Sequence, residues 1–217
     1  MLVVSDVYTL PDLLARAVNE HPDSDIVVFP NSRTTFTELY ERASKAARSL
    51  KAIGITQGDS VGILMLNCIE FVDLLLGSQL IGAIPVPINA RYKAKELAYV
   101  IDDAGLKVLA TTDRIVEHVY FVNLLQEAFP DLENQTDPMR LELSEARNLN
   151  SIVLFGERMP TGMLDTETFE TLSKNIDEEV IEISRSRLQV RDIAMMMYTS
   201  GTTANPKGCP ITHEALV

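Results

Sequence analysis

The sequence predicts an α/β fold, a mostly parallel β-sheet that is flanked by helices. Segments with helical spacing of apolar residues alternate along the chain with short runs of consecutive apolar residues. A strand that is apolar on both faces is typical of a parallel sheet that is covered on both sides. Right-handed crossovers would join such strands. We found no internal repeat or low-complexity tract in the 217 residues.

The first half of the chain supplies most of the expected elements. Thr9 is typical of a helix N-cap, and that helix should end near Pro22. Thr35 and Glu38 have the spacing of a capping box, and the apolar residues after them recur at helical spacing up to Gly54. Further helices are expected at residues 70–80, at 94–104 and from Asp113 as cap towards 129, and strands at 25–29, 59–66, 84–88 and 107–110.

The second half of the chain has a weaker pattern. Residues 130–150 are polar and charged, which is typical of a surface excursion with one or two helical turns. Residues 177–191 carry many charges and predict a connector. We therefore expect an N-terminal α/β subdomain at 1–190 and the opening of an incomplete second subdomain at 191–217. One strand is expected at residues 151–155 and one short helix at 166–174.

Composition excludes several classes of protein. Hydrophobic residues make up 46% and charged residues 23%, so the chain should bury a core. The net charge of -12 argues against nucleic acid or an anionic membrane as a partner, because both require a positive field. The most apolar stretch, 71–88, contains Asp73 and Pro85 and does not predict a transmembrane segment. Cys68 and Cys209 are expected to be reduced thiols in a cytoplasmic protein.

The segment from Tyr198 to Gly208, with the sequence YTSGTTANPKG, is the strongest functional signal. Its small and hydroxyl-bearing residues supply hydrogen-bond donors without bulk, and Lys207 follows between a proline and a glycine. The apolar run 193–197 precedes the segment, and residues 212–216 have the pattern of a helix start. A strand, a donor-rich turn, a lysine and a helix start together predict a polyphosphate site.

Other phosphate-binding motifs fit less well. In the P-loop of nucleoside triphosphatases a second glycine stands where this chain has Pro206, and a hydroxyl residue stands where it has Gly208. The chain also lacks a Gly-x-Gly-x-x-Gly dinucleotide turn. A polar surface turn that contains one lysine is the simpler alternative.

The segment closely resembles the phosphate loop of the adenylate-forming enzymes, which include acyl-CoA synthetases, beetle luciferases and the adenylation domains of peptide synthetases. Ala204 stands where that family usually has glycine. The resemblance extends in order from about residue 9 to residue 217. Its other parts are residues 35–39, 59–63, 67–71, 82–89 and 97–104.

The resemblance implies the first subdomain of the adenylate-forming fold, truncated at the start of the second. It also implies a reaction in which ATP and a small-molecule carboxylic acid give an acyl-adenylate and pyrophosphate, followed by a thioester with coenzyme A. ATP would be used with Mg²⁺. The catalytic residues and the metal ligand are expected downstream of Val217, so we expect the 217 residues alone to be inactive. The residues that would bind the β- and γ-phosphates are Thr199, Ser200, Gly201, Thr202 and Thr203, with Lys207 steadying the loop or the phosphates.

We consider the N-terminal part of an acyl-CoA synthetase the leading hypothesis. One alternative is a naturally truncated protein that binds a nucleotide or a partner without catalysis, and another is an unrelated phosphate-binding α/β protein. His213 is expected to have a structural role near a helix start, although its position allows a role near the nucleotide. Residues 195–197 are expected in a core strand, and Asp102 and Asp103 on a solvated face.

Overall fold

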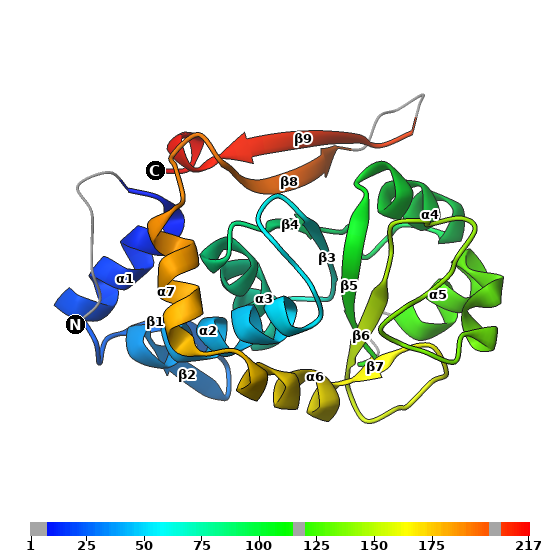
Figure 1. Cartoon of the computed structure of the whole chain (residues 1–217), viewed down its shortest axis with the longest axis horizontal. Coiled ribbons are helices and arrows are strands. Elements are labelled where there is room, and N and C mark those ends of the chain that lie inside the picture. Colours follow the sequence, from blue (N-terminus) through cyan, green and yellow to red (C-terminus); the bar gives the residue numbers. More distant parts are fainter. Residues whose placement is uncertain (1–7, 115–119, 200–204) are drawn as a thin grey trace.

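A five-stranded parallel sheet forms the centre of the computed structural model, which describes residues 8–114, 120–199 and 205–217. The strands lie in the order β4-β3-β5-β6-β7, and each neighbouring pair is parallel. Helices flank the sheet (Figure 1), which confirms the predicted fold class. The strands are β3 (Ser60–Leu64), β4 (Ile84–Pro87), β5 (Leu106–Thr112), β6 (Ser151–Phe155) and β7 (Leu164–Asp165).

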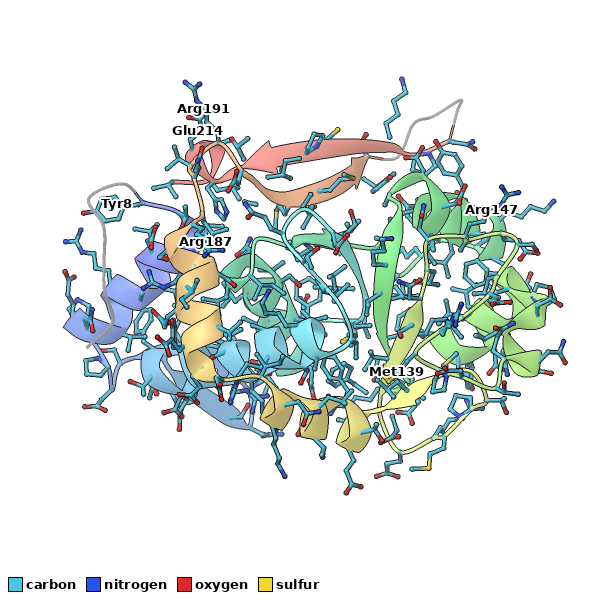
Figure 2. The ribbon with its side chains drawn as sticks, viewed as in Figure 1. Tyr8, Met139, Arg147, Arg187, Arg191 and Glu214 are labelled. Carbon is cyan, nitrogen blue, oxygen red and sulfur yellow. The ribbon has the colours of Figure 1, made fainter. Side chains whose placement is uncertain are left out.

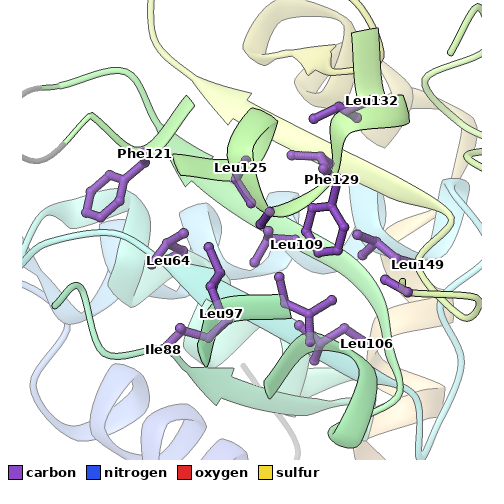
Figure 3. Packing of buried hydrophobic residues seen from close by; sticks show 14 of the residues in the cluster. Leu64, Ile88, Leu97, Leu106, Leu109, Phe121, Leu125, Phe129, Leu132 and Leu149 are labelled. Atoms are coloured by element: carbon purple, nitrogen blue, oxygen red, sulfur yellow. The ribbon is translucent and has the colours of Figure 1, made fainter. Parts of the chain in front are cut away.

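Two hydrophobic clusters cover the two faces of this sheet. Leu109 of β5 belongs to the cluster with α4 (Ala94–Asp103) and α5 (Phe121–Ala128), part of which Figure 3 shows. Val108, the preceding residue of the same strand, belongs to the cluster on the opposite face. Because successive side chains of a strand point to opposite faces, burial of both faces requires consecutive apolar residues. The helices that contribute to the second cluster are α1 (Leu10–Glu20), α2 (Phe36–Ala52), α3 (Ile69–Leu80), α6 (Thr166–Leu172) and α7 (Glu178–Ser186).

Two helix starts follow directly from the local sequence. Thr9 caps α1 and Thr35 caps α2, each in a capping box with the residue three positions later. The Thr35 Oγ1 accepts the Glu38 N–H at 3.3 Å, and the Glu38 carboxylate accepts the Thr35 N–H at 2.8 Å. Each box satisfies two backbone donors that the helix itself leaves unpaired.

Three expectations about the irregular segments were wrong. The expected connector 177–191 contains α7, and its Arg185 is buried. The polar stretch 130–150 has one 3₁₀ turn (Pro130–Asn134), but it also places leucines in the core. Helix α5 begins after Tyr120, whereas the carboxylate of Asp113, the expected cap, accepts the N–H groups of Glu157 and Arg158 at 2.8 Å each. The buried leucines of the polar stretch are Leu132, Leu141, Leu143 and Leu149.

Two antiparallel strand pairs lie outside the five-stranded sheet. Strand β1 (Asp25–Phe29) pairs with β2 (Ser32–Thr35), a strand that the sequence pattern did not indicate. Strand β8 (Ile193–Thr199) pairs with β9 (Lys207–Thr212). We call this second pair the β8–β9 ribbon. No helix among the described residues is long and apolar enough to cross a membrane.

Candidate functional site

The predicted phosphate loop connects the two strands of the β8–β9 ribbon. Thr199 ends β8, Lys207 begins β9, and these two residues are register partners. Both are exposed at the end of the ribbon that carries the loop, which we call the loop end and which Figure 1 places beside α4. The other predicted phosphate-binding residues, Ser200, Gly201, Thr202 and Thr203, lie outside the described residues, as does Ala204.

The expected helix start at residues 212–216 is present as a 3₁₀ turn, His213–Ala215, with Thr212 as its N-cap. The strand β9, which begins at Lys207 and precedes this turn, was not indicated by the sequence pattern. The backbone explains this turn, because the His213 N–H donates to the Asp192 carbonyl at 3.1 Å and the Glu214 N–H donates to the Val190 carbonyl at 2.8 Å. These bonds return the chain to the start of β8. In the described part of the site, Lys207 and Thr199 are the predicted phosphate-binding residues, and a strand rather than a helix N-terminus begins at Lys207.

One face of the ribbon lies against the core. Met196 and Tyr198 pack on the cluster that contains α4 and α5. The buried Gln79 donates from Nε2 to the Ala194 carbonyl at 2.8 Å, which ties β8 to the end of α3. The expectation of a core strand at residues 195–197 holds in part, since Met197 remains 40% exposed. The ribbon is thus attached along its length to the α/β domain.

The loop end of the ribbon is attached to α4 through side chains that the sequence pattern did not indicate. The Tyr198 hydroxyl donates to Asp103 Oδ2 at 2.6 Å, and the Tyr99 hydroxyl donates to Asp103 Oδ1 at 3.1 Å. Asp103 is exposed, as expected, but it has two partners. Burial, followed by the hydrogen bond to Asp103, raises the pKa of Tyr198, which keeps its hydroxyl a proton donor at neutral pH.

The opposite end of the ribbon, where β8 begins and β9 ends, is attached to α1. His213 is 1% exposed, and its Nδ1 accepts the Leu10 N–H at 3.2 Å. Burial lowers the pKa of His213, although Asp192 and Asp12 oppose the shift. These contacts agree with the expected structural role. Arg191 and Glu214 lie together at this end in Figure 2, with 3.9 Å between Arg191 Nε and a Glu214 carboxylate oxygen.

The described residues contain no group of three or more His, Cys, Asp or Glu side chains that could hold a metal ion. The donors of this part of the site, the Lys207 ammonium and the Thr199 hydroxyl, are of the kind that phosphate oxygens accept. Mg²⁺ on a nucleotide is usually bound through one or two carboxylates together with the phosphates, so it does not require a cluster of three such side chains.

Comparison with known proteins gives a consistent result. The model of the family "AMP-binding enzyme" matches residues 14–217. The chain is 30% identical over 209 residues to the putative acyl-CoA synthetase YngI of Bacillus subtilis, covering 94% of this chain and 37% of that protein. It is 29% identical over 192 residues to the mitochondrial medium-chain acyl-CoA ligase ACSF2 of Homo sapiens, covering 88% of this chain and 31% of that protein.

Solved structures extend the similarity to three dimensions. The anthranilate CoA ligase AuaEII, in complex with anthranoyl-AMP, matches with a TM-score of 0.74 at 25% identity, covering 97% of this chain and 36% of that one. The N-terminal domain of FACL13 from Mycobacterium tuberculosis matches with a TM-score of 0.70 at 25% identity, covering 95% and 44%. The chain spans about a third of the length of the curated relatives, between 30% and 37%.

Proposed function

The chain belongs to the AMP-binding enzyme family, and from this membership we propose that it is the N-terminal part of an AMP-forming acyl-CoA ligase. The observation that carries the proposal is the match over residues 14–217, which includes the loop between β8 and β9. The exposed Lys207 and Thr199 at the two ends of that loop give it the charge and the donors that a triphosphate requires.

The chemistry assigns a definite task to these groups. A carboxylate oxygen of the acid attacks the α-phosphorus of ATP, the bond to the β-phosphate oxygen breaks, and pyrophosphate leaves with the electron pair. Negative charge grows on the leaving group, so cations and N–H or O–H donors around the β- and γ-phosphates lower the barrier. We assign this role to Lys207 and to Thr199 through Thr203. A bound Mg²⁺ would neutralise further charge on the phosphates.

The second half of the reaction needs groups that we place outside these residues. The thiol of coenzyme A attacks the acyl carbon of the adenylate, AMP leaves, and a thioester forms. About two thirds of each curated relative has no counterpart in this chain. We therefore propose that the 217 residues bind ATP without catalysing adenylation, and that the acyl pocket and catalytic residues belong to the unmatched part. A cytoplasmic location stays a prediction.

We also propose the domain division that the sequence pattern predicts. Residues 1–190 would form the first subdomain, and residues 191–217 would open the second. The β8–β9 ribbon supports this division, because it shares no strand pairing with the five-stranded sheet. The second candidate function is a protein that binds a nucleotide or a partner and catalyses nothing.

Calorimetric titration of the chain with ATP tests the proposal. We expect binding, and we expect Lys207→Ala to weaken it about tenfold, because a charge-assisted contact to phosphate is lost. Lys95→Ala is the matched control, since Lys95 is an exposed lysine on α4. Absence of ATP binding, or equal losses in the two variants, would contradict the assignment.

Two further measurements separate the candidates. An ATP–pyrophosphate exchange assay on the chain should give no signal, and a signal would refute the proposed inactivity. The intact mass of the protein in its native cell distinguishes the two functions. A mass well above 24.1 kDa favours the ligase, whereas a mass near 24.1 kDa favours the non-catalytic candidate.

A further inference from the structure

We propose that the hydrogen bond between Tyr198 and Asp103 positions the phosphate loop by fixing the loop end of the β8–β9 ribbon against the C-terminal end of α4. The inference rests on the proposed function of the loop. In this role Tyr198 and Asp103 are positioning residues that hold the two ends of the loop in place. We call this hydrogen-bonded pair the tyrosine clasp.

The clasp joins parts of the chain that are far apart in sequence. Tyr198 precedes Thr199, the last described residue before the loop, and Asp103 is the last residue of α4. Their side chains meet at 2.6 Å across a sequence separation of 95 residues. A hydroxyl that donates to a carboxylate makes a short and comparatively strong hydrogen bond. The clasp therefore connects the N-terminal flank of the loop to the α/β domain.

The other flank of the loop is held through the same ring. Gly208 is the register partner of Tyr198. A Cβ added to Gly208 would lie 3.1 Å from both the Cζ and the hydroxyl oxygen of Tyr198. The tyrosine ring thus occupies the space that a side chain directly after Lys207 would fill. Because Gly208 is paired with Tyr198 in the ribbon, the clasp restrains both strands at the rung next to Thr199 and Lys207.

The carboxylate of the clasp is itself oriented from within α4. Tyr99 lies one helical turn before Asp103 and donates to its other oxygen at 3.1 Å. Two donors on separate oxygens fix the carboxylate plane, and each bond polarises its neighbour. Tyr99 touches the clasp at Asp103, and it provides a matched control because its hydroxyl can be removed while the Tyr198 bond remains.

The last rungs of the ribbon benefit from such a restraint because a two-stranded antiparallel pair gains little stability from its own strand pairing. Without the clasp, the last rungs would open more often, and the two ends of the loop would separate. A ligand that binds only when these last rungs are paired would then have a higher apparent dissociation constant, because a smaller fraction of the molecules has the rungs paired. A hydrogen bond of ordinary net strength predicts a change of about fivefold.

Amide hydrogen exchange on the whole 217-residue chain tests the clasp without a ligand. We expect Tyr198→Phe to speed exchange about fivefold at residues 198–199 and 207–208. Exchange at the end opposite the loop, residues 193–195 and 211–212, and in β5 should stay unchanged. This result would also show that the variant is folded. Asp103→Ala should reproduce this pattern, because alanine has no acceptor for the Tyr198 hydroxyl, and Tyr99→Phe should change exchange less than twofold.

The affinity for ATP provides the second readout. Tyr198→Phe should weaken binding about fivefold, and adding Asp103→Ala to it should cause no further loss, because both changes break the same bond. Any of three results would overturn the proposal: unchanged exchange at the loop end, equal acceleration of exchange along the whole ribbon, or losses of ATP affinity that multiply in the double variant. If the unchanged chain binds no ATP, the proposed function fails, and the exchange pattern still decides whether the clasp holds the ribbon.

Discussion

Replacement of Arg185 should destabilise the fold more than a change at any other charged side chain considered above. Its side chain on α7 is 3% exposed, and Nη1 lies 2.6 Å from Asp12 Oδ1 in α1. Nη2 lies 2.9 Å from Glu182 Oε2. Asp12 also belongs to the capping box of α1, where its carboxylate accepts the Thr9 hydroxyl at 2.8 Å. Arg185→Ala would leave this carboxylate, 9% exposed, without its cation.

The cost follows from the burial of both partners. Breaking a buried ion pair on one side costs about 3–5 kcal/mol, because the remaining charge stays out of water without compensation. The total stability of a domain is about 5–15 kcal/mol, so the variant should lose a large fraction of it. With a urea slope near the middle of the usual range, about 2 kcal/mol/M, the unfolding midpoint should fall by about 1.5–2.5 M.

Urea denaturation followed by circular dichroism measures this change. Arg187→Ala is the matched control, because Arg187 lies two residues after Arg185, directly after α7, and is exposed (Figure 2). Its effect should stay within about 0.5 kcal/mol. Arg185→Ala combined with Asp12→Asn should recover part of the loss, because the amide carries no charge. A loss below about 1 kcal/mol in Arg185→Ala, or equal losses in the two single variants, would refute this reasoning.

Three other outcomes are expected. The pKa of His213 is lowered in the folded protein, so its contribution to the free energy of unfolding is present above the unfolded pKa of about 6.5 and is lost as the pH falls below that value. Urea titrations at pH 7.5 and 5.5 should show lower stability at pH 5.5, and a His213→Asn variant should show a smaller difference between the two pH values. Gly77→Ala should destabilise by about 1–3 kcal/mol despite the better helix propensity of alanine, because its Cβ would lie 2.8 Å from the Ala43 carbonyl oxygen; an unchanged melting temperature would contradict this. Phe169→Ala should cost about 3–5 kcal/mol in urea, since the ring is 2% exposed and meets Phe155 edge to face, whereas a cost near 1 kcal/mol would mean that the site collapses around the smaller side chain.

The local elements were predicted well because their causes lie within a few residues. The capping boxes at Thr9 and Thr35 need a side chain only three positions away, and both are present. The buried strands β3 and β5 were visible as apolar runs because both faces of the sheet are covered. The family resemblance likewise rested on short, ordered motifs, and the match over residues 14–217 confirms it.

The segments that were predicted wrongly depend on distant partners. The charged stretch 177–191 looked like a connector because its sequence does not reveal that Asp12, 173 residues away, pairs with Arg185. The strand β9 at residues 207–212 was missed, because the sequence pattern indicated only the helix start that follows it, which is present as a 3₁₀ turn. Backbone pairing with the distant strand β8 decided this conformation.

The sequence by itself determined the α/β fold class, the helix caps and the phosphate-loop motif, because periodicity and short-range spacing encode them. Only the tertiary structure decided how that motif is held. It set Thr199 and Lys207 on paired strands and brought Asp103 to Tyr198. The physical reason is that a hydrogen bond or ion pair between residues that are about a hundred positions apart forms only after packing of the core has brought them together.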